Sequence, residues 1–212
     1  MLKIETIPVT EFLQNARLLW DSDSLEGVVI DPGGDAGKIM DSVRRERVKV
    51  KAVWLTHSHL DHCGGVAPLL KELSCPLVGH PDETVMRQGV RAIASMYGLP
   101  EDDWHDCPEP GVLVTGGETL HVGPHEATVL FTPGHSPGHV SFYFPREKTL
   151  ISGDALFAGS IGRTDLPGGN HRELISSIKE RILPLPDDTK VLSGHGEDTT
   201  VGEERRSNPF LV

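Results

Sequence analysis

The chain has 212 residues, of which 37% are hydrophobic and 24% are charged, a balance that excludes a disordered protein and favours one large globular domain. A formal net charge of −11 argues against nucleic acid as a partner, because the phosphate backbone repels an acidic surface. No apolar run has membrane-spanning length, and the N-terminus lacks the basic and apolar regions of a signal peptide. We therefore expect a cytoplasmic protein with no membrane and no obligate protein partner.

The first half of the chain predicts strands that alternate with helices. Apolar and β-branched stretches predict strands at residues 2–9, 16–20, 25–31, 51–56 and 75–80. The turn residues of 31–34 end the third of these strands. Helices are expected over 35–47, 60–73 and 81–97, although Gly89 weakens the last one. The strand expected at 51–56 ends where the first histidine of a dense polar motif begins.

The second half repeats this alternation. Strands are predicted at residues 118–123, 126–132, 140–144, 149–153 and 190–194. A helix is expected over 171–183, because Asn170 and Glu173 have the spacing of a capping box with asparagine at the N-cap. Loops rich in histidine and aspartate follow strand after strand, at residues 57, 135, 154 and 195. Sheets covered by helices, with ligands at the strand ends, define a layered α/β architecture.

Residues 56–65 read THSHLDHCGG, which places three histidines and one aspartate within six positions. His57 and His59 are two residues apart and can point the same way from an extended segment. Asp61 and His62 begin the following helix and can face a second point. Imidazole and carboxylate groups together suit zinc, manganese or iron, so this segment predicts ligands for two metal ions.

Three further metal donors are expected in the second half. His135 lies in the Pro/Gly loop TPGHSPGH, Asp154 directly follows a predicted buried strand, and His195 lies between two glycines. A buried carboxylate without a compensating charge costs several kcal/mol, which a cation offsets. His139 begins the next strand and is expected to be a structural donor. The three cysteines, Cys63, Cys75 and Cys107, form no C-x-x-C pair and are expected to be reduced.

Four segments together resemble the metallo-β-lactamase fold superfamily: THSHLDH at 56–62, PGHSPGH at 133–139, GD at 153–154 and SGHG at 193–196. The likeness is strongest to the glyoxalase II group, the hydroxyacylglutathione hydrolases, and especially to its short bacterial members. The resemblance implies an αββα sandwich, formed by a single domain over residues 1–212. The helical C-terminal region of long glyoxalase II enzymes is not expected here.

The resemblance also implies a site and a reaction. It assigns His57, His59 and His135 to one metal ion, Asp61, His62 and His195 to a second, and Asp154 as the bridge between them. Two divalent ions are implied, zinc first, with iron or manganese as alternatives. The implied reaction is hydrolysis of a small-molecule thioester such as S-D-lactoylglutathione by a metal-bound hydroxide. Asp61 and Asp154 are the expected catalytic residues, with Asp61 orienting the nucleophile.

The segment FAGSIGRTDLPGGN that follows Asp154 is expected to border the substrate pocket. In glyoxalase II enzymes the corresponding loop carries a basic residue that contacts glutathione, and Arg163 falls at that place. The alternatives are a surface arginine or an arginine paired with Asp165. Arg163 and Asp165 are the candidates for substrate binding. The chain departs from the family in this loop, because the usual tyrosine is missing and Asp165 lies near its place. Arg205 and Arg206 are further basic candidates near the C-terminus.

Three other functions are compatible with the motifs. A persulfide dioxygenase of this fold would use one iron held by His57, His135 and Asp154, a facial triad, and resembles the chain in its Gly-Arg-Thr-Asp loop at 162–165. A lactonase would direct the same hydroxide at an ester. A diiron electron-transfer module would have glutamate at position 59, where this chain has histidine. Aspartate rather than cysteine at position 154 also argues against a typical β-lactamase.

Overall fold

The computed structural model describes residues 1–100 and 104–212, which group into two compact units. The N-terminal unit comprises Met1–Leu113 with Val122–His125, and the C-terminal unit comprises Val114–His121 with Glu126–Val212. Within the described residues, each unit is built around a six-stranded sheet. The expected α/β class is therefore present in both units.

The N-terminal sheet has the order β1 (Leu2–Val9), β2 (Gln14–Asp21), β3 (Glu26–Ile30), β4 (Lys49–Trp54), β5 (Leu77–Gly79) and β6 (Val112–Leu113). The first three strands pair antiparallel, and β3 to β6 pair in parallel. Parallel strands end at the same edge of a sheet. The residues that follow β3, β4 and β5 therefore emerge together, and the histidine-rich motif of 56–65 is among them.

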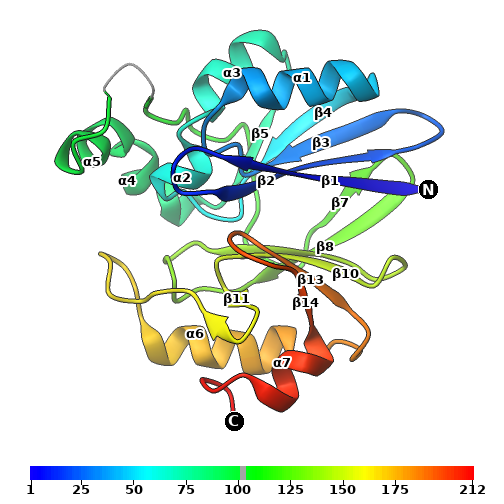
Figure 1. The fold of residues 1–212 in the computed structure, drawn as a ribbon, viewed down its shortest axis with the longest axis vertical. Helices are drawn as coiled ribbons and strands as arrows, with labels where there is room; N and C mark the ends of the chain where they lie inside the picture. The colour runs from blue at the N-terminus through cyan, green and yellow to red at the C-terminus, as the bar shows by residue number, and fades with distance from the viewer. Residues whose placement is uncertain (101–103) are drawn as a thin grey trace. The chain divides into compact units, whose positions relative to one another are not determined.

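Two helices cover one side of this sheet, α1 (Ala36–Glu46) and α3 (Val66–Glu72), which lie side by side above the strands in Figure 1. Ile39 and Val43 on α1 and Leu69 on α3 belong to one buried core with Leu18 and Val53 of the sheet. Each such apolar side chain contributes about 1.5–3 kcal/mol when it is fully buried. This core fixes the strands whose ends carry the polar residues.

The C-terminal sheet has the order β14 (Thr199–Thr200), β13 (Lys190–Ser193), β10 (Thr149–Gly153), β9 (Val140–Phe144), β8 (His125–Phe131) and β7 (Thr119–Val122). β10 is parallel to β13, whereas β9 is antiparallel to both β10 and β8. The strands β8, β10 and β13 therefore run in the same direction. Their ends lead into His135, Asp154 and His195, the three donors expected in this half.

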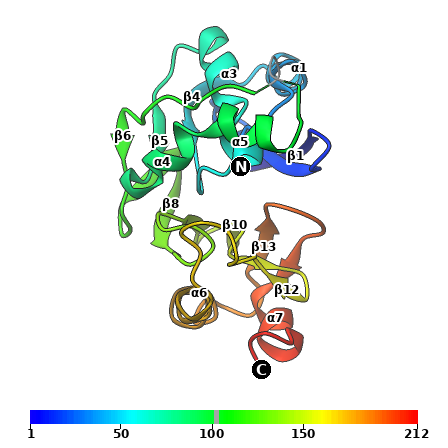
Figure 2. The ribbon, with the colours of Figure 1, turned by 90° about the vertical axis from the view of Figure 1, so that its left-hand side faces the viewer.

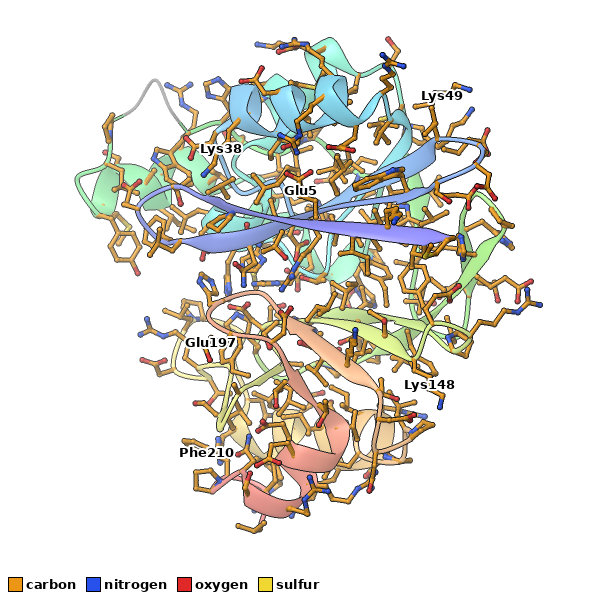
Figure 3. All side chains as sticks on the ribbon, turned by 45° about the vertical axis from the view of Figure 1, so that its right-hand side comes forward. Glu5, Lys38, Lys49, Lys148, Glu197 and Phe210 are labelled. Atoms are coloured by element: carbon orange, nitrogen blue, oxygen red, sulfur yellow. The ribbon has the colours of Figure 1, made fainter. Side chains whose placement is uncertain are left out.

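Two helical segments cover one face of the C-terminal sheet (Figure 2). The first consists of α6 (His171–Ser177) and a π-helical turn, η3 (Ile178–Ile182), and the second is α7 (Val201–Ser207). Leu174, Ile178 and Val201 pack in one core with Leu150 and Val191 of the sheet. A small hairpin of β11 (Leu156–Phe157) and β12 (Ser160–Ile161) follows Asp154. Beyond α7, the ring of Phe210 is 49% exposed at the surface (Figure 3).

The helix expected over 60–73 is interrupted. It consists of α2 (Leu60–Cys63) and α3, with Gly64 and Gly65 between them. At the break the Gly65 amide donates to the carbonyl oxygen of Pro32 at 2.9 Å, outside the helix, and a Cβ atom at Gly65 would lie 2.6 Å from that oxygen. This contact brings the loop after β3 against the segment that carries the histidines.

The helix expected over 81–97 is also divided, into η1 (Pro81–Glu83), α4 (Thr84–Arg87) and α5 (Val90–Met96). Gly89 is the residue before α5, as its low helix propensity suggests. The helix expected over 171–183 is confirmed in extent, and the Asn170 side chain accepts a hydrogen bond from the Glu173 amide at 3.2 Å. The short elements β6, β11, β12, β14 and α7 were not predicted.

The cysteines behave as expected from their spacing. Cys63 and Cys107 are buried, Cys75 is half-buried, and all three are free thiols. Burial, together with the neighbouring Cys107 thiol, raises the pKa of the Cys63 thiol well above its usual range. Among the helices of the described ranges, none is long and apolar enough to cross a membrane.

Candidate functional site

The N-terminal unit holds four of the expected ligands in one cluster after β4. The rings of His57 and His62 have their centroids 4.0 Å apart, and those of His57 and His59 are 4.8 Å apart. His57 and His62 are buried, whereas His59 is half-buried and the Asp61 side chain is 17% exposed. The Asp61 carboxylate lies 3.8 Å from Nε2 of His62. The motif therefore gathers three imidazoles and a carboxylate at the edge of the sheet.

Asp31 is a site residue that the sequence analysis read only as a turn. It follows β3, is 2% exposed, and accepts hydrogen bonds from the Thr56 amide at 2.7 Å and the Thr56 hydroxyl at 2.6 Å. Nδ1 of His62 lies 3.1 Å from the same carboxylate. Its position directly after a buried strand, like that of Asp154, is the sequence signal that could have identified it.

Gly33, two residues after Asp31, allows the loop after β3 to lie against the backbone of Asp61. A Cβ atom at Gly33 would lie 1.5 Å from the carbonyl oxygen of Asp61, a distance that no side chain tolerates. The loop after β3 can therefore approach the metal-ligand motif only with glycine at this position. Any substitution at Gly33 would push the two segments apart.

The C-terminal unit gathers the other three expected ligands. A single carboxylate oxygen, Oδ2 of Asp154, lies 3.5 Å from Nε2 of His135 and 3.7 Å from Nε2 of His195. Two ligands held about 2.1 Å from one tetrahedral zinc ion are about 3.4 Å apart. The separations within this group are thus close to those of ligands around a cation, and Asp154 is the member near both histidines.

Hydrogen bonds at Nδ1 define the tautomers of three of the histidines. Nδ1 of His135 lies 2.7 Å from the carbonyl oxygen of Arg163, and Nδ1 of His62 faces the Asp31 carboxylate. With an oxygen acceptor at each Nδ1, the ring nitrogen is the donor, and the side-chain amide of Gln14, 3.3 Å from Nδ1 of His62, fits this when its oxygen faces the ring. The Thr56 hydroxyl donates to Asp31 and therefore accepts at 3.0 Å from Nδ1 of His57. In all three rings Nε2 then carries the lone pair that a metal ligand needs.

His139 differs from these rings because both of its nitrogens have partners within the protein. Its Nε2 accepts a hydrogen bond from the Asp154 amide at 3.1 Å, and its Nδ1 lies 2.9 Å from the hydroxyl of Thr132. Both nitrogens therefore serve the protein itself. The expected structural role of His139 fits this geometry, because the ring holds the backbone of Asp154 in place.

The donor sets fit divalent metal ions. The three buried rings described above present Nε2, their Nδ1 atoms bond to oxygen acceptors as is usual for metal-binding histidines, and the carboxylates of Asp61 and Asp154 supply oxygen donors. Such a mixture of imidazole and carboxylate accepts zinc, iron or manganese. The assignment of these residues as ligands of two metal ions stays a prediction from the resemblance.

Arg163 and Asp165, the expected substrate-binding residues, bind each other. Nε of Arg163 lies 2.8 Å from Oδ1 of Asp165, and Nη2 lies 2.8 Å from Oδ2, so the pair is bidentate. Hydrogen bonds from Arg163 lower the pKa of Asp165 to about 2. The side chains are 59% and 69% exposed, so the pair adds little stability. In this structure Arg163 therefore forms the ion pair with Asp165 that was one of the alternatives.

Comparison with known proteins identifies the family. Residues 9–195 match the metallo-beta-lactamase superfamily. The hydroxyacylglutathione hydrolase GloC of Haemophilus influenzae is 38% identical over 217 residues, covering 99% of this chain and 98% of the relative. The chain therefore belongs to the metallo-β-lactamase superfamily, and its class is that of a metallo-hydrolase. The fold expected from the motifs is confirmed.

Two solved structures are similar along nearly their whole length. The BLEG-1 B3 metallo-beta-lactamase has a TM-score of 0.90 at 40% identity, covering 99% of this chain and 100% of that one. TTHA1623, solved in a di-iron-bound form, has a TM-score of 0.88 at 39% identity, covering 98% and 100%. A di-iron form of one relative agrees with a divalent-metal site but leaves the metal of this chain open.

Proposed function

We propose that this protein is a metal-dependent thioesterase of the glyoxalase II type, which hydrolyses S-D-lactoylglutathione or a similar small thioester. The observation that carries the proposal is the set of seven imidazole and carboxylate groups at the strand ends of the two units, in which the Nδ1 contacts of His57, His62 and His135 leave Nε2 for a metal. The likeness to the hydrolase GloC over almost the entire chain supports the reaction class.

We assign the metal ligands as the resemblance implies. One ion would be held by His57, His59 and His135 and the other by Asp61, His62 and His195, with Asp154 shared. Divalent ions bound there supply Lewis acidity, which lowers the pKa of water toward neutrality and stabilises charge on a carbonyl oxygen. Zinc is the metal we propose first, and the donor set equally accepts iron or manganese.

The chain's own residues have distinct tasks in this proposal. Asp61, with its partly exposed carboxylate beside His62, accepts a hydrogen bond from the attacking water and takes up its proton. Asp154 places one carboxylate oxygen near both His135 and His195, where a shared cation would hold the three groups, and His139 fixes the Asp154 backbone. Asp31 and Thr56 hold the rings of His62 and His57 in the tautomer that exposes Nε2.

The Arg163–Asp165 pair bears on the thiol half of the substrate. The backbone carbonyl of Arg163 accepts from His135, so the guanidinium extends from a residue that already contacts a proposed ligand. A carboxylate of glutathione would have to compete with Asp165 for this guanidinium. We propose that Arg163 binds the glutathione moiety and that Asp165 weakens this binding.

Opposite effects on KM are expected for the two members of this pair. Arg163→Met should raise the KM for S-D-lactoylglutathione, and Asp165→Asn should lower it, each by about 2- to 5-fold, the range of an exposed ion pair. The value of kcat should change little. Because the pKa of Asp165 is about 2, its carboxylate stays ionised, and the Asp165→Asn effect should be constant from pH 5 to 9.

Lys148→Met and Asp188→Asn are matched controls, since Lys148 and Asp188 form an equally exposed pair elsewhere on the C-terminal unit. Neither should alter KM. For a thioester of an uncharged thiol, the KM should be the same in all four variants as in the native protein. An increase of KM in both Arg163→Met and Asp165→Asn would contradict competition and would indicate that Asp165 itself contacts the substrate.

The proposed function is tested by anaerobic turnover. Purified protein should hydrolyse S-D-lactoylglutathione without oxygen, and its metal content, counted in the same sample, should be about two ions per chain. A panel of acyl lactones and a β-lactam tests the other hydrolase reactions of the family. Negligible hydrolysis, together with one iron per chain and oxygen uptake on glutathione persulfide, would overturn the proposal in favour of the dioxygenase.

A further inference from the structure

Ser58 lies between the proposed ligands His57 and His59, and each of its polar groups is held by the protein. Its amide donates to Oε2 of Glu83 at 2.7 Å. Its hydroxyl accepts from Nη1 of Arg87 at 3.4 Å, and its carbonyl oxygen accepts from Sγ of Cys63 at 3.4 Å. Ser58 is 1% exposed. The residue that joins the two histidines therefore has a fixed backbone and a fixed side chain.

The shortest of these contacts is the hydrogen bond from the Ser58 amide to the buried carboxylate of Glu83. Glu83 is 1% exposed and closes the η1 turn after β5. A carboxylate that accepts a backbone N–H at this short distance forms a charge-assisted hydrogen bond, roughly twice as strong as a neutral one. Burying a carboxylate is costly unless such bonds compensate it. Glu83 is thus a buried carboxylate whose oxygen accepts from the metal-ligand loop, at the amide of Ser58.

Arg87 fixes the segment that carries Glu83. It is fully buried, and Nη1 donates to the carbonyl oxygen of His80 at 2.9 Å. Nη2 donates to the Thr84 hydroxyl at 2.9 Å and to Glu109 at 2.8 Å. These contacts join the end of β5 to α4 on both sides of Glu83. The carboxylate is therefore held rigidly toward Ser58.

We propose that Glu83 is a positioning residue for the metal centre, which acts through the Ser58 amide to hold His57 and His59 in the orientation that binds metal. The inference rests on the metal ligands of the proposed function and adds a residue outside the ligand set. Binding sites of this kind require their ligands within about 0.5 Å of the productive geometry. Rotation of the peptide before Ser58 would turn the two rings away from each other.

The test is metal binding by the folded apoprotein. Glu83→Ala is expected to weaken the binding of zinc or cobalt by about 10- to 100-fold, as for other residues that orient ligands. Glu83→Gln keeps an oxygen acceptor without the charge and should have an intermediate effect. The absorption bands of bound cobalt should also change in Glu83→Ala, because they report the ligand geometry. A residue with a purely structural role would leave these bands unchanged.

Glu204 provides the matched control. It is also 1% exposed and its carboxylate accepts the Gly159 amide at 3.0 Å in the C-terminal unit. Because the Glu204 carboxylate also accepts from the Thr199 hydroxyl and the Asn208 side-chain amide, both at 2.7 Å, Glu204→Ala should lower the melting temperature of the apoprotein at least as much as Glu83→Ala, while its metal affinity stays within 2-fold of the native protein. This comparison separates lost stability from lost ligand positioning.

The proposal is overturned if folded Glu83→Ala binds metal within 2-fold of the native protein, or if Glu204→Ala weakens binding equally. If the Glu83→Ala apoprotein does not fold, the metal affinities of Glu83→Gln and Glu204→Gln are compared instead. We expect a loss of metal affinity of at least 3-fold for Glu83→Gln and none for Glu204→Gln. Metal affinity is measured without substrate. Failure of thioester hydrolysis would therefore leave this test intact, and failure of this test would leave the proposed reaction standing.

Discussion

Replacing Asp154 with alanine is expected to lower the occupancy of both metal ions together and to reduce kcat/KM by at least about 100-fold. That factor is the upper end of what residues that only orient metal ligands cost, and Asp154 is proposed as a ligand itself. One of its oxygens lies near both His135 and His195. Its loss removes a ligand and the negative charge that both histidines share.

Metal content per chain, measured after dialysis, checks this expectation. Asp188→Ala serves as the control, because Asp188 lies on the same unit, is 62% exposed and pairs only with Lys148 among the described contacts. Its metal content and activity should equal those of the native protein. Retention of one full equivalent of metal by Asp154→Ala would contradict the bridging role.

The second large effect is expected from Asp31→Asn. An asparagine amide group at this position would present a donor to the Thr56 hydroxyl or to Nδ1 of His62, both of which now donate to the carboxylate. His62 would then keep its Nδ1 proton through the side-chain amide of Gln14, 3.3 Å away, or else move the proton to Nε2, which removes the lone pair needed for metal binding. We expect about 10- to 100-fold weaker metal binding and about 1–3 kcal/mol lower stability.

Asparagine is the informative replacement because Asp31 has φ = 50°, a left-handed conformation that asparagine adopts more readily than alanine. The difference between Asp31→Asn and the native protein therefore contains little backbone strain. Asp21→Asn is the control, since Asp21 is also 2% exposed and accepts the Ser24 amide in the same unit. It should lower stability without altering metal affinity. Native-like metal binding by Asp31→Asn would contradict the tautomer argument.

Much of the fold was predictable because its longer elements carry clear periodic patterns. The strands around Leu18, Val29 and Phe142 and the helix that begins after Asp35 are marked by apolar runs or by an amphipathic pattern. The breaks at Gly65 and Gly89 were harder to place, because glycine is tolerated within helices and the close approach of Pro32 is a tertiary contact. Two-residue strands such as β6 are too short to have a pattern.

The candidate site was predictable where chemistry is concentrated in sequence. His57, His59, Asp61 and His62 stand within six positions, and His135, Asp154 and His195 each follow a strand. Asp31, Ser58 and Glu83 were missed because their importance lies in hydrogen bonds between segments distant in sequence. The Arg163–Asp165 pair was one of the alternatives read from the sequence, whereas its bidentate geometry is known only from the structure.

The most direct test of the central claim is a titration of the chelated, folded apoprotein with zinc while the anaerobic hydrolysis of S-D-lactoylglutathione is followed. The account predicts no turnover without metal, a rate that rises with added zinc, and saturation at about two ions per chain. Hydrolysis that is equally fast in the metal-free protein, or that zinc, iron and manganese all fail to restore, would contradict the account.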